Sequence, residues 1–189
     1  MKIFRLGLLL LVVGFISSVL LGYVYMTTQK IIAARQKENL VRQQKEIFPE
    51  ATDFSEIKIE PNDQTKVVRL FQAVRQNKPV GFIGQVSSSG YGGEVLVLVG
   101  ITPAGIVEKV RILKENETPG LGKGIVRDDF LGQFSGKDWS VVKLRKDKDK
   151  GEIESLTGAS RSSRAVTGAV QELGRYLQSH QLILSSRVN

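Results

Sequence analysis

The sequence begins with a long uncharged segment, and this segment constrains the fold more than any other feature. Residues 6–26 read LGLLLLVVGFISSVLLGYVYM, 21 residues without a charged side chain. A helix needs roughly 20 apolar residues to cross a bilayer. Tyr23 and Tyr25 stand near one end, where aromatic side chains favour the membrane–water interface. The sequence therefore predicts a transmembrane anchor over residues 1–28.

A cleaved signal peptide is the alternative interpretation of this segment. Such a peptide has an apolar core of about 7–15 residues, followed by a cleavage site with small side chains. Here the apolar segment is longer, and MTTQK follows it. We therefore expect an uncleaved anchor. The polar residues after it have a helical pattern and predict a stalk over residues 29–50, which ends near Pro49 because proline disfavours helix at the preceding residue.

Residues 51–189 have the size of one domain, and their hydrophobic pattern predicts the α+β class. Strands are expected over 80–90, 93–101, 106–113 and 139–144, with the second and third forming a hairpin, while 65–77 is ambiguous between strand and helix. A short helix is expected over 125–134, an exposed charged turn over 145–151 and an amphipathic helix over 163–179. The prediction is a curved antiparallel sheet with packed helices.

The composition excludes several kinds of functional site. There is no Cys and one His, so disulfides, cysteine-ligated clusters and His-rich or thiolate metal sites are excluded. Redox work would need an organic cofactor. The net charge of +8 attracts polyanions, but the basic residues are not interleaved with aromatic ones as in a nucleic-acid platform. A membrane-tethered module that binds a polyanion or a protein partner stays open, and no nucleic acid is expected as partner.

Two glycine-rich segments stand out along the domain. SSSGYGGE, residues 87–94, predicts a turn between strands or a place where another group approaches the backbone closely. KENETPGLGKG, residues 114–124, contains the turn dipeptide Pro119–Gly120 and is long enough to suggest a functional loop. In each case an ordinary connecting loop is the alternative.

A third segment, ESLTGASRSSRAV, covers residues 154–166 and precedes the last helix. Its serines could cap that helix by accepting bonds from free backbone N–H groups. It could also bind a phosphate, because Gly158 and Ala159 leave space beside Ser160, and a helix start attracts anions. Arg161 and Arg164 add charge-assisted donors. No base lies nearby in the sequence, so we expect no catalytic nucleophile here.

The order of GYGGEVLVLVGI, ENETPGLGKGI and IESLTGASRSSRAV behind one apolar segment resembles the FMN-binding domain of the G subunit of Rnf-type ion-translocating ferredoxin:NAD⁺ oxidoreductases. It is also similar to the C subunit of Na⁺-translocating NADH:quinone oxidoreductases. In that family a flavin transferase uses FAD to attach FMN by a phosphoester to the last hydroxyl of a D-x-x-[ST]-G-A-[ST] motif. Residues 154–160 match this motif, with Glu154 in place of Asp and Ser160 in place of the commoner Thr.

The resemblance implies which residues hold the flavin. Ser160 is the expected acceptor of covalent FMN, and Glu154, Thr157, Gly158 and Ala159 are the motif positions around it. The loop ETPGLG lies against the flavin in the family. The remaining flavin neighbours that the resemblance implies are therefore Glu117, Thr118, Leu121, Gly122, Tyr91 and Gly92.

The resemblance also implies a role. The chain is expected to be a single-pass subunit of the bacterial cytoplasmic membrane, with its soluble domain on the extracytoplasmic side. It would relay electrons within a multisubunit ion-translocating oxidoreductase and would not be catalytic alone. A C-like subunit of the quinone reductase, or an FMN-domain protein of another respiratory chain, is the alternative within the same class.

Overall fold

The computed structural model describes residues 2–59, 65–147 and 151–183. They divide into two compact units, Met1–Gln43 and Gln44–Asn189. Residues 148–150 of the predicted charged turn lie outside the described residues, while Arg145 and Lys146 are exposed as expected.

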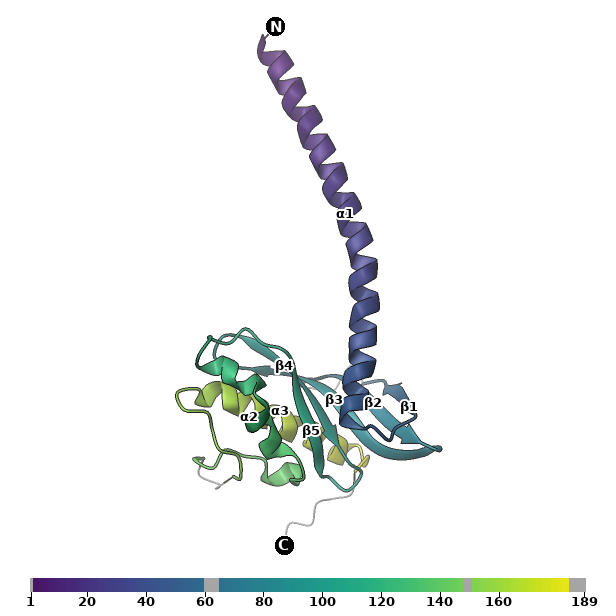
Figure 1. Ribbon diagram of the computed structural model, residues 1–189, viewed down its shortest axis with the longest axis vertical. Coiled ribbons are helices and arrows are strands. Elements are labelled where there is room, and N and C mark those ends of the chain that lie inside the picture. Colours follow the sequence, from purple (N-terminus) through teal and green to yellow (C-terminus); the bar gives the residue numbers. More distant parts are fainter. Residues whose placement is uncertain (1, 60–64, 148–150, 184–189) are drawn as a thin grey trace. The chain divides into compact units, whose positions relative to one another are not determined.

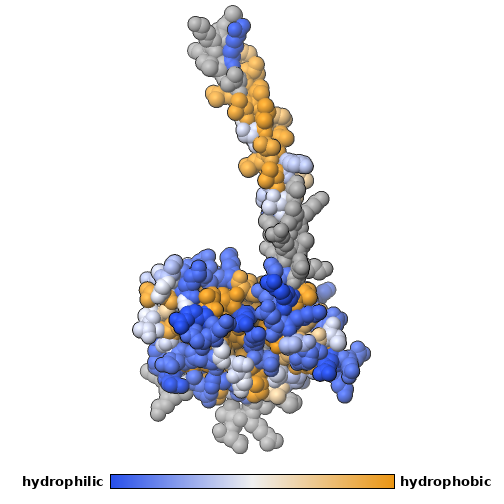
Figure 2. Space-filling model, in the orientation of Figure 1, coloured by the Kyte–Doolittle hydropathy of each residue, from blue (hydrophilic) through white to orange (hydrophobic). Residues whose placement is uncertain are grey.

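The first unit belongs to one long helix, α1, which spans Lys2–Ile47 (Figure 1). It ends at Ile47, just before Pro49. Large apolar side chains between Phe4 and Met26 are exposed along it, and Figure 2 shows them as an orange surface. Within the residues that the structure describes, no helix combines the length and the apolarity needed to cross a membrane. The part of the predicted anchor that the structure describes, residues 2–28, is helical.

The second unit is built on a five-stranded sheet in which each strand pairs antiparallel with the next one along the chain. The strands are β1 Asp53–Ile57, β2 Val67–Arg75, β3 Lys78–Ser89, β4 Glu94–Ile101 and β5 Val107–Lys114. The predicted α+β class and the β4–β5 hairpin are confirmed, and the ambiguous segment 65–77 is a strand.

Side chains from other segments pack directly on both faces of the sheet at positions where a strand has glycine. A Cβ on Gly84 would lie 2.4 Å from Leu173 Cδ1, so the helix α3, Ser160–Ser179, packs directly on the backbone of β3. A Cβ on Gly81 would lie 2.1 Å from the Phe48 ring. Side chains alternate along a strand, so residues 81 and 84 face opposite sides. The segment around Phe48 therefore covers one face and α3 the other.

The main core lies between the sheet and α3. The predicted apolar stripe of α3 is confirmed, since all six of its residues are buried: Val166, Ala169, Val170, Leu173, Tyr176 and Leu177. Short helices complete this core: the 3₁₀ helices Gly122–Val126, Gly132–Phe134 and Trp139–Val141, and α2, Asp128–Leu131. α3 packs mainly on β3 and β4, whereas α2 lies near β5 (Figure 1).

The strand predicted over residues 139–144 is wrong. Trp139–Val141 is a 3₁₀ helix whose first turn is capped by Asp138, which accepts from Ser140 N at 2.9 Å and from Ser140 Oγ at 2.7 Å. A Cβ on Gly174 would lie 2.2 Å from the Trp139 ring, so this indole packs against the backbone of α3. The buried apolar residues of this run, Trp139, Val142 and Leu144, lie outside the five-stranded sheet, and periodicity alone cannot distinguish this arrangement from a strand.

Candidate functional site

Glu117 connects the three segments singled out in the sequence. Its side chain is buried, with 5% of the residue exposed. One carboxylate oxygen accepts a hydrogen bond from Tyr91 N at 2.8 Å, and the other accepts from Gly92 N at 3.2 Å and from Ser162 Oγ at 2.9 Å. A buried charge is tolerated when several donors satisfy it. The β3–β4 loop, the loop after β5 and the start of α3 therefore converge on one carboxylate.

The glycines beside Glu117 are needed for this close approach. A Cβ on Gly90 would lie 2.0 Å from Glu117 Oε1, and a Cβ on Gly122 would lie 2.4 Å from Glu117 Oε2. A Cβ on Gly92 would lie 2.1 Å from the backbone oxygen of Asn116. Of the two interpretations of residues 87–94, close approach of another group is correct for Gly90 and Gly92. The loop also forms the turn between β3 and β4, so both interpretations apply.

The loop after β5 turns at the predicted dipeptide Pro119–Gly120. Gly120 has φ +80°, and Leu121 N donates to Thr118 O at 3.2 Å, which closes the turn. Lys123 N donates to the same oxygen at 3.1 Å. A positive φ at the third position is what glycine permits in such a turn. The turn presents Leu121, which is 52% exposed, to solvent.

A cavity of about 350 Å³, here called the Glu117 cavity, opens between these segments. Its size is within the usual range for small-molecule sites. Seven of the residues predicted as flavin neighbours or motif positions line it, together with Arg161 and Ser162: Tyr91, Glu117, Thr118, Leu121, Gly122, Gly158 and Ala159. Gly92 does not line the cavity, but its N–H group donates a hydrogen bond to Glu117, which does.

The start of α3 differs from the expected helix cap. The helix begins at Ser160, three residues earlier than predicted, and the preceding Ala159 makes no side-chain cap. Ser163 Oγ accepts from Leu156 N at 3.1 Å and donates to Ala159 O at 2.9 Å, while Ser162 donates to Glu117. Serine capping is therefore wrong. The first N–H groups of a helix have no partner within it, so the end at Ser160 retains donors for a ligand.

Two residues of the charged turn contact this helix start, and sequence reasoning missed both. Lys146 Nζ donates a hydrogen bond to Ser160 Oγ. Asp147 Oδ1 accepts from Arg164 at 2.6 Å, and this bond raises the pKa of the guanidinium. Arg164 is thus paired within the protein rather than directed at a phosphate. Fourteen residues separate Lys146 from Ser160, which no local pattern signals.

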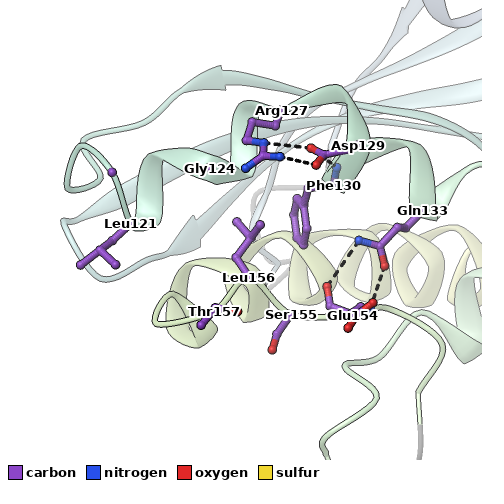
Figure 3. Close-up of a pocket in the computed structure, with 11 residues that line it drawn as sticks. Leu121, Gly124, Arg127, Asp129, Phe130, Gln133, Glu154, Ser155, Leu156 and Thr157 are labelled. Carbon is purple, nitrogen blue, oxygen red and sulfur yellow. Dashed lines mark hydrogen bonds and ion pairs between the residues drawn. The ribbon is translucent and has the colours of Figure 1, made fainter.

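The first half of the 154–160 motif lines a different hollow, here called the Glu154 groove, with a volume of about 480 Å³. Figure 3 shows Gln133 reaching the backbone of Glu154, accepting from its N–H at 2.8 Å and donating to its carbonyl at 3.4 Å. Glu154 and Thr157 line this groove, not the Glu117 cavity. Leu121 borders both hollows. Nine of the predicted site residues therefore line one of these hollows or both, whereas Gly92 and Ser160 line neither. Within the described chain, no group of His, Asp and Glu side chains is arranged to hold a metal ion.

Comparison with known proteins identifies the family. Residues 90–174, which contain the Glu117 cavity and Ser160, match the FMN-binding domain family. The chain is 32% identical, over 90% of its length and 89% of the relative, to the G subunit of the proton-translocating ferredoxin:NAD(+) oxidoreductase complex of Clostridium ljungdahlii. The chain belongs to this family of G subunits. The resemblance inferred from the three segments is therefore confirmed.

Other relatives agree with this assignment. The G subunit of the Na(+)-translocating ferredoxin:NAD(+) oxidoreductase complex of Acetobacterium woodii is also 32% identical, over 89% of this chain and 88% of the relative. The G subunit of the ion-translocating oxidoreductase complex of Vibrio cholerae is 29% identical, over 97% of this chain and 94% of the relative. The fold is similar to the crystal structure of the C subunit of Na(+)-translocating NADH-quinone reductase from Parabacteroides distasonis, with a TM-score of 0.53 at 20% identity, covering 72% of this chain and 80% of that one.

Proposed function

We propose that this chain is the flavoprotein G subunit of an Rnf-type ion-translocating ferredoxin:NAD⁺ oxidoreductase and relays electrons through FMN bound covalently to Ser160. One observation carries the proposal: the three segments that resemble the family converge on one cavity, and its lining includes Ala159 and Arg161, the chain neighbours of the serine that matches the attachment motif. The relatives described above are G subunits, which favours this complex over a C-like role in a quinone reductase.

The residues around the Glu117 cavity suit FMN. Its size is adequate, and Arg161 in its lining supplies a cation for the phosphate. Ser160 is half-buried at the start of α3, where free N–H groups and the helix dipole favour an anion. Gly158, with φ +72°, lets the chain turn into this helix beside the cavity. Ser160 can reach solvent, which the attachment of a large group by a second protein requires.

FMN supplies the electron-transfer chemistry, and the protein contributes binding and electrostatics. Glu117 fixes the walls of the cavity by holding Tyr91 and Gly92 on one side and Ser162 on the other. Tyr91 and Leu121 are 71% and 52% exposed at the cavity, where they offer apolar contacts to a planar ring. None of these groups is a catalytic residue. We therefore propose that the chain is an electron-transfer part of a larger enzyme.

The proposed complex is a membrane assembly, and the exposed apolar part of α1 is the proposed site of membrane association. Burial of so many apolar side chains, from Phe4 to Met26, is favourable in lipid or against membrane subunits. The proposed orientation is the one that the family implies, with the domain on the extracytoplasmic side. Full-length chain expressed in bacteria should sediment with membranes and resist a salt wash, whereas a chain lacking residues 1–26 should be soluble. Full-length chain in the soluble fraction would contradict this.

Covalent attachment has a direct test. The full chain, expressed with a flavin transferase and FAD, should gain the mass of one FMN after denaturation, and Ser160→Ala should lose it entirely. Ser163→Ala is the matched hydroxyl control and should keep the modification. A colourless wild-type protein would favour the alternative, a module that binds a polyanion or partner. Full FMN mass on Ser160→Ala would overturn the assignment of the acceptor.

A further inference from the structure

The side chain that contacts the Ser160 hydroxyl comes from outside the attachment motif. Lys146 donates a hydrogen bond to Ser160 Oγ from the turn that precedes the motif. Of the cations around the helix start, Arg164 is paired with Asp147 and Arg161 lines the Glu117 cavity. Lys146 is the cation in contact with the hydroxyl itself.

Lys146 lies in a turn that is anchored to the rest of the domain both before and after this residue. Upstream, Leu144 and Ile153 are fully buried and form a parallel bridge, and Arg145 N donates to Ile153 O at 2.8 Å. Asp147 N then donates to Leu144 O at 2.9 Å, which closes a tight turn around Lys146. Downstream, the Asp147–Arg164 ion pair at 2.6 Å fastens the turn to the first two turns of α3. The ammonium group is thus positioned by an anchored turn rather than by chance contact of a free side chain.

We infer that Lys146 is the positioning residue for flavin attachment, a role that rests on the proposed function. Its ammonium orients Ser160 Oγ and stabilises negative charge on that oxygen and on the phosphate that joins it. In the attachment step, Ser160 Oγ forms a bond to the phosphorus of the FMN half of FAD. The bond from that phosphorus to the bridging oxygen breaks, AMP leaves with the electron pair, and the hydroxyl proton passes to a base of the transferase.

The product of this step also requires a cation. A phosphodiester on Ser160 carries one negative charge, and a charge-assisted hydrogen bond from an ammonium group stabilises it. Lys146 is exposed, so water screens part of this effect, and the expected consequence is on rate rather than on whether attachment occurs.

The experiment compares attachment rates among variants of the full chain. Flavin-free protein is mixed with a transferase and FAD, and intact mass is followed over time. Lys146→Ala should slow attachment by about three- to tenfold, the loss expected for one partly exposed charge-assisted bond. Lys146→Arg should restore most of the rate, because it returns the charge. Arg145→Ala removes the same charge from the neighbouring exposed position and should leave the rate unchanged.

The outcomes separate this inference from the proposed function. If Lys146→Ala acquires FMN at the wild-type rate, the role of Lys146 is overturned, whereas the proposed attachment to Ser160 is unaffected. Equal slowing in Lys146→Ala and Lys146→Arg also overturns it, because the charge at residue 146 would then not matter. Equal slowing in Arg145→Ala overturns it as well, because the position of the charge would then not matter. Absence of FMN on the wild type, or its persistence on Ser160→Ala, overturns the proposed function itself. Unchanged thermal midpoints of the flavin-free variants exclude loss of fold as the cause.

Discussion

The candidate site has two ends that are built in opposite ways: the Glu117 carboxylate in the wall of the Glu117 cavity, and the Ser160 hydroxyl outside the lining of that cavity. At one end, the buried Glu117 carboxylate accepts three hydrogen bonds from two separate segments, and glycines allow the backbone to approach it. At the other end, Ser160 is half-buried and its hydroxyl contacts an exposed lysine. The buried end determines the shape of the cavity, whereas the exposed end leaves its hydroxyl accessible to another protein. Substitutions at the first should change stability, and substitutions at the second should change attachment.

The largest expected loss of stability comes from Gly92→Ala. Its Cβ would lie 2.1 Å from the backbone oxygen of Asn116, so two backbone segments must separate. Such overpacking should lower the free energy of unfolding by about 3 kcal/mol, measured by chemical denaturation of the flavin-free protein. The displaced β3–β4 loop would also weaken the bonds to Glu117.

Gly132→Ala is the matched control for this substitution. No atom lies within 4 Å of a Cβ there, and the backbone is helical, with φ −62° and ψ −23°. Its free energy of unfolding should change by less than about 0.5 kcal/mol. Equal stability of Gly92→Ala and Gly132→Ala would show that the buried end of the site is not tightly packed, and the contrast between the two ends would fail.

The second prediction concerns the carboxylate itself. Glu117→Gln keeps the shape but replaces one accepting oxygen by an NH₂ group, which leaves a backbone N–H or the Ser162 hydroxyl without its acceptor. The free energy of unfolding should fall by about 1–2 kcal/mol. Glu94→Gln, an exposed glutamate that accepts from Ser87 Oγ at 2.6 Å, is the control and should be nearly neutral.

A double-mutant cycle sharpens this prediction. If Ser162 and Glu117 act through one bond, the effects of Glu117→Gln and Ser162→Ala should not add. The site-specific readout is the mass of attached FMN, which should remain in Glu117→Gln as long as the domain folds. Additive losses of stability, or complete loss of attachment in a folded Glu117→Gln protein, would contradict the division between shape and attachment.

Much of this fold could be predicted because most of its strands and its last helix have recognisable local sequence patterns. Hydrophobic runs and glycine turns marked β3, β4 and β5, and helical periodicity marked α3, whose predicted stripe is buried as expected. Trp139–Val141 was misjudged because a short apolar segment that packs partly against a helix has the same composition as a strand.

The candidate site was only partly predictable for a different reason. Its motif residues could be named from a resemblance, but their division between the Glu117 cavity and the Glu154 groove depends on how distant segments pack. The roles of Glu117 as a junction and of Lys146 as the partner of Ser160 come from contacts across 45 and 14 residues of sequence. No spacing rule reports such contacts, since tertiary packing alone creates them.

The smallest expected effect on stability comes from Asp147→Asn at the exposed end. This change removes the ion pair with Arg164. The Arg164 side chain is 55% exposed and the Asp147 side chain is 33% exposed. Exposed pairs contribute little, so the free energy of unfolding should change by no more than about 0.5 kcal/mol. The attachment rate should nevertheless fall, because the turn that carries Lys146 loses its hold on α3. Glu152→Gln, which breaks the exposed pair with Lys137 outside the cavity, should match its small effect on stability without slowing attachment. A larger loss of stability in Asp147→Asn than in Glu117→Gln would reverse the contrast between the two ends and make the charged turn part of the structural framework.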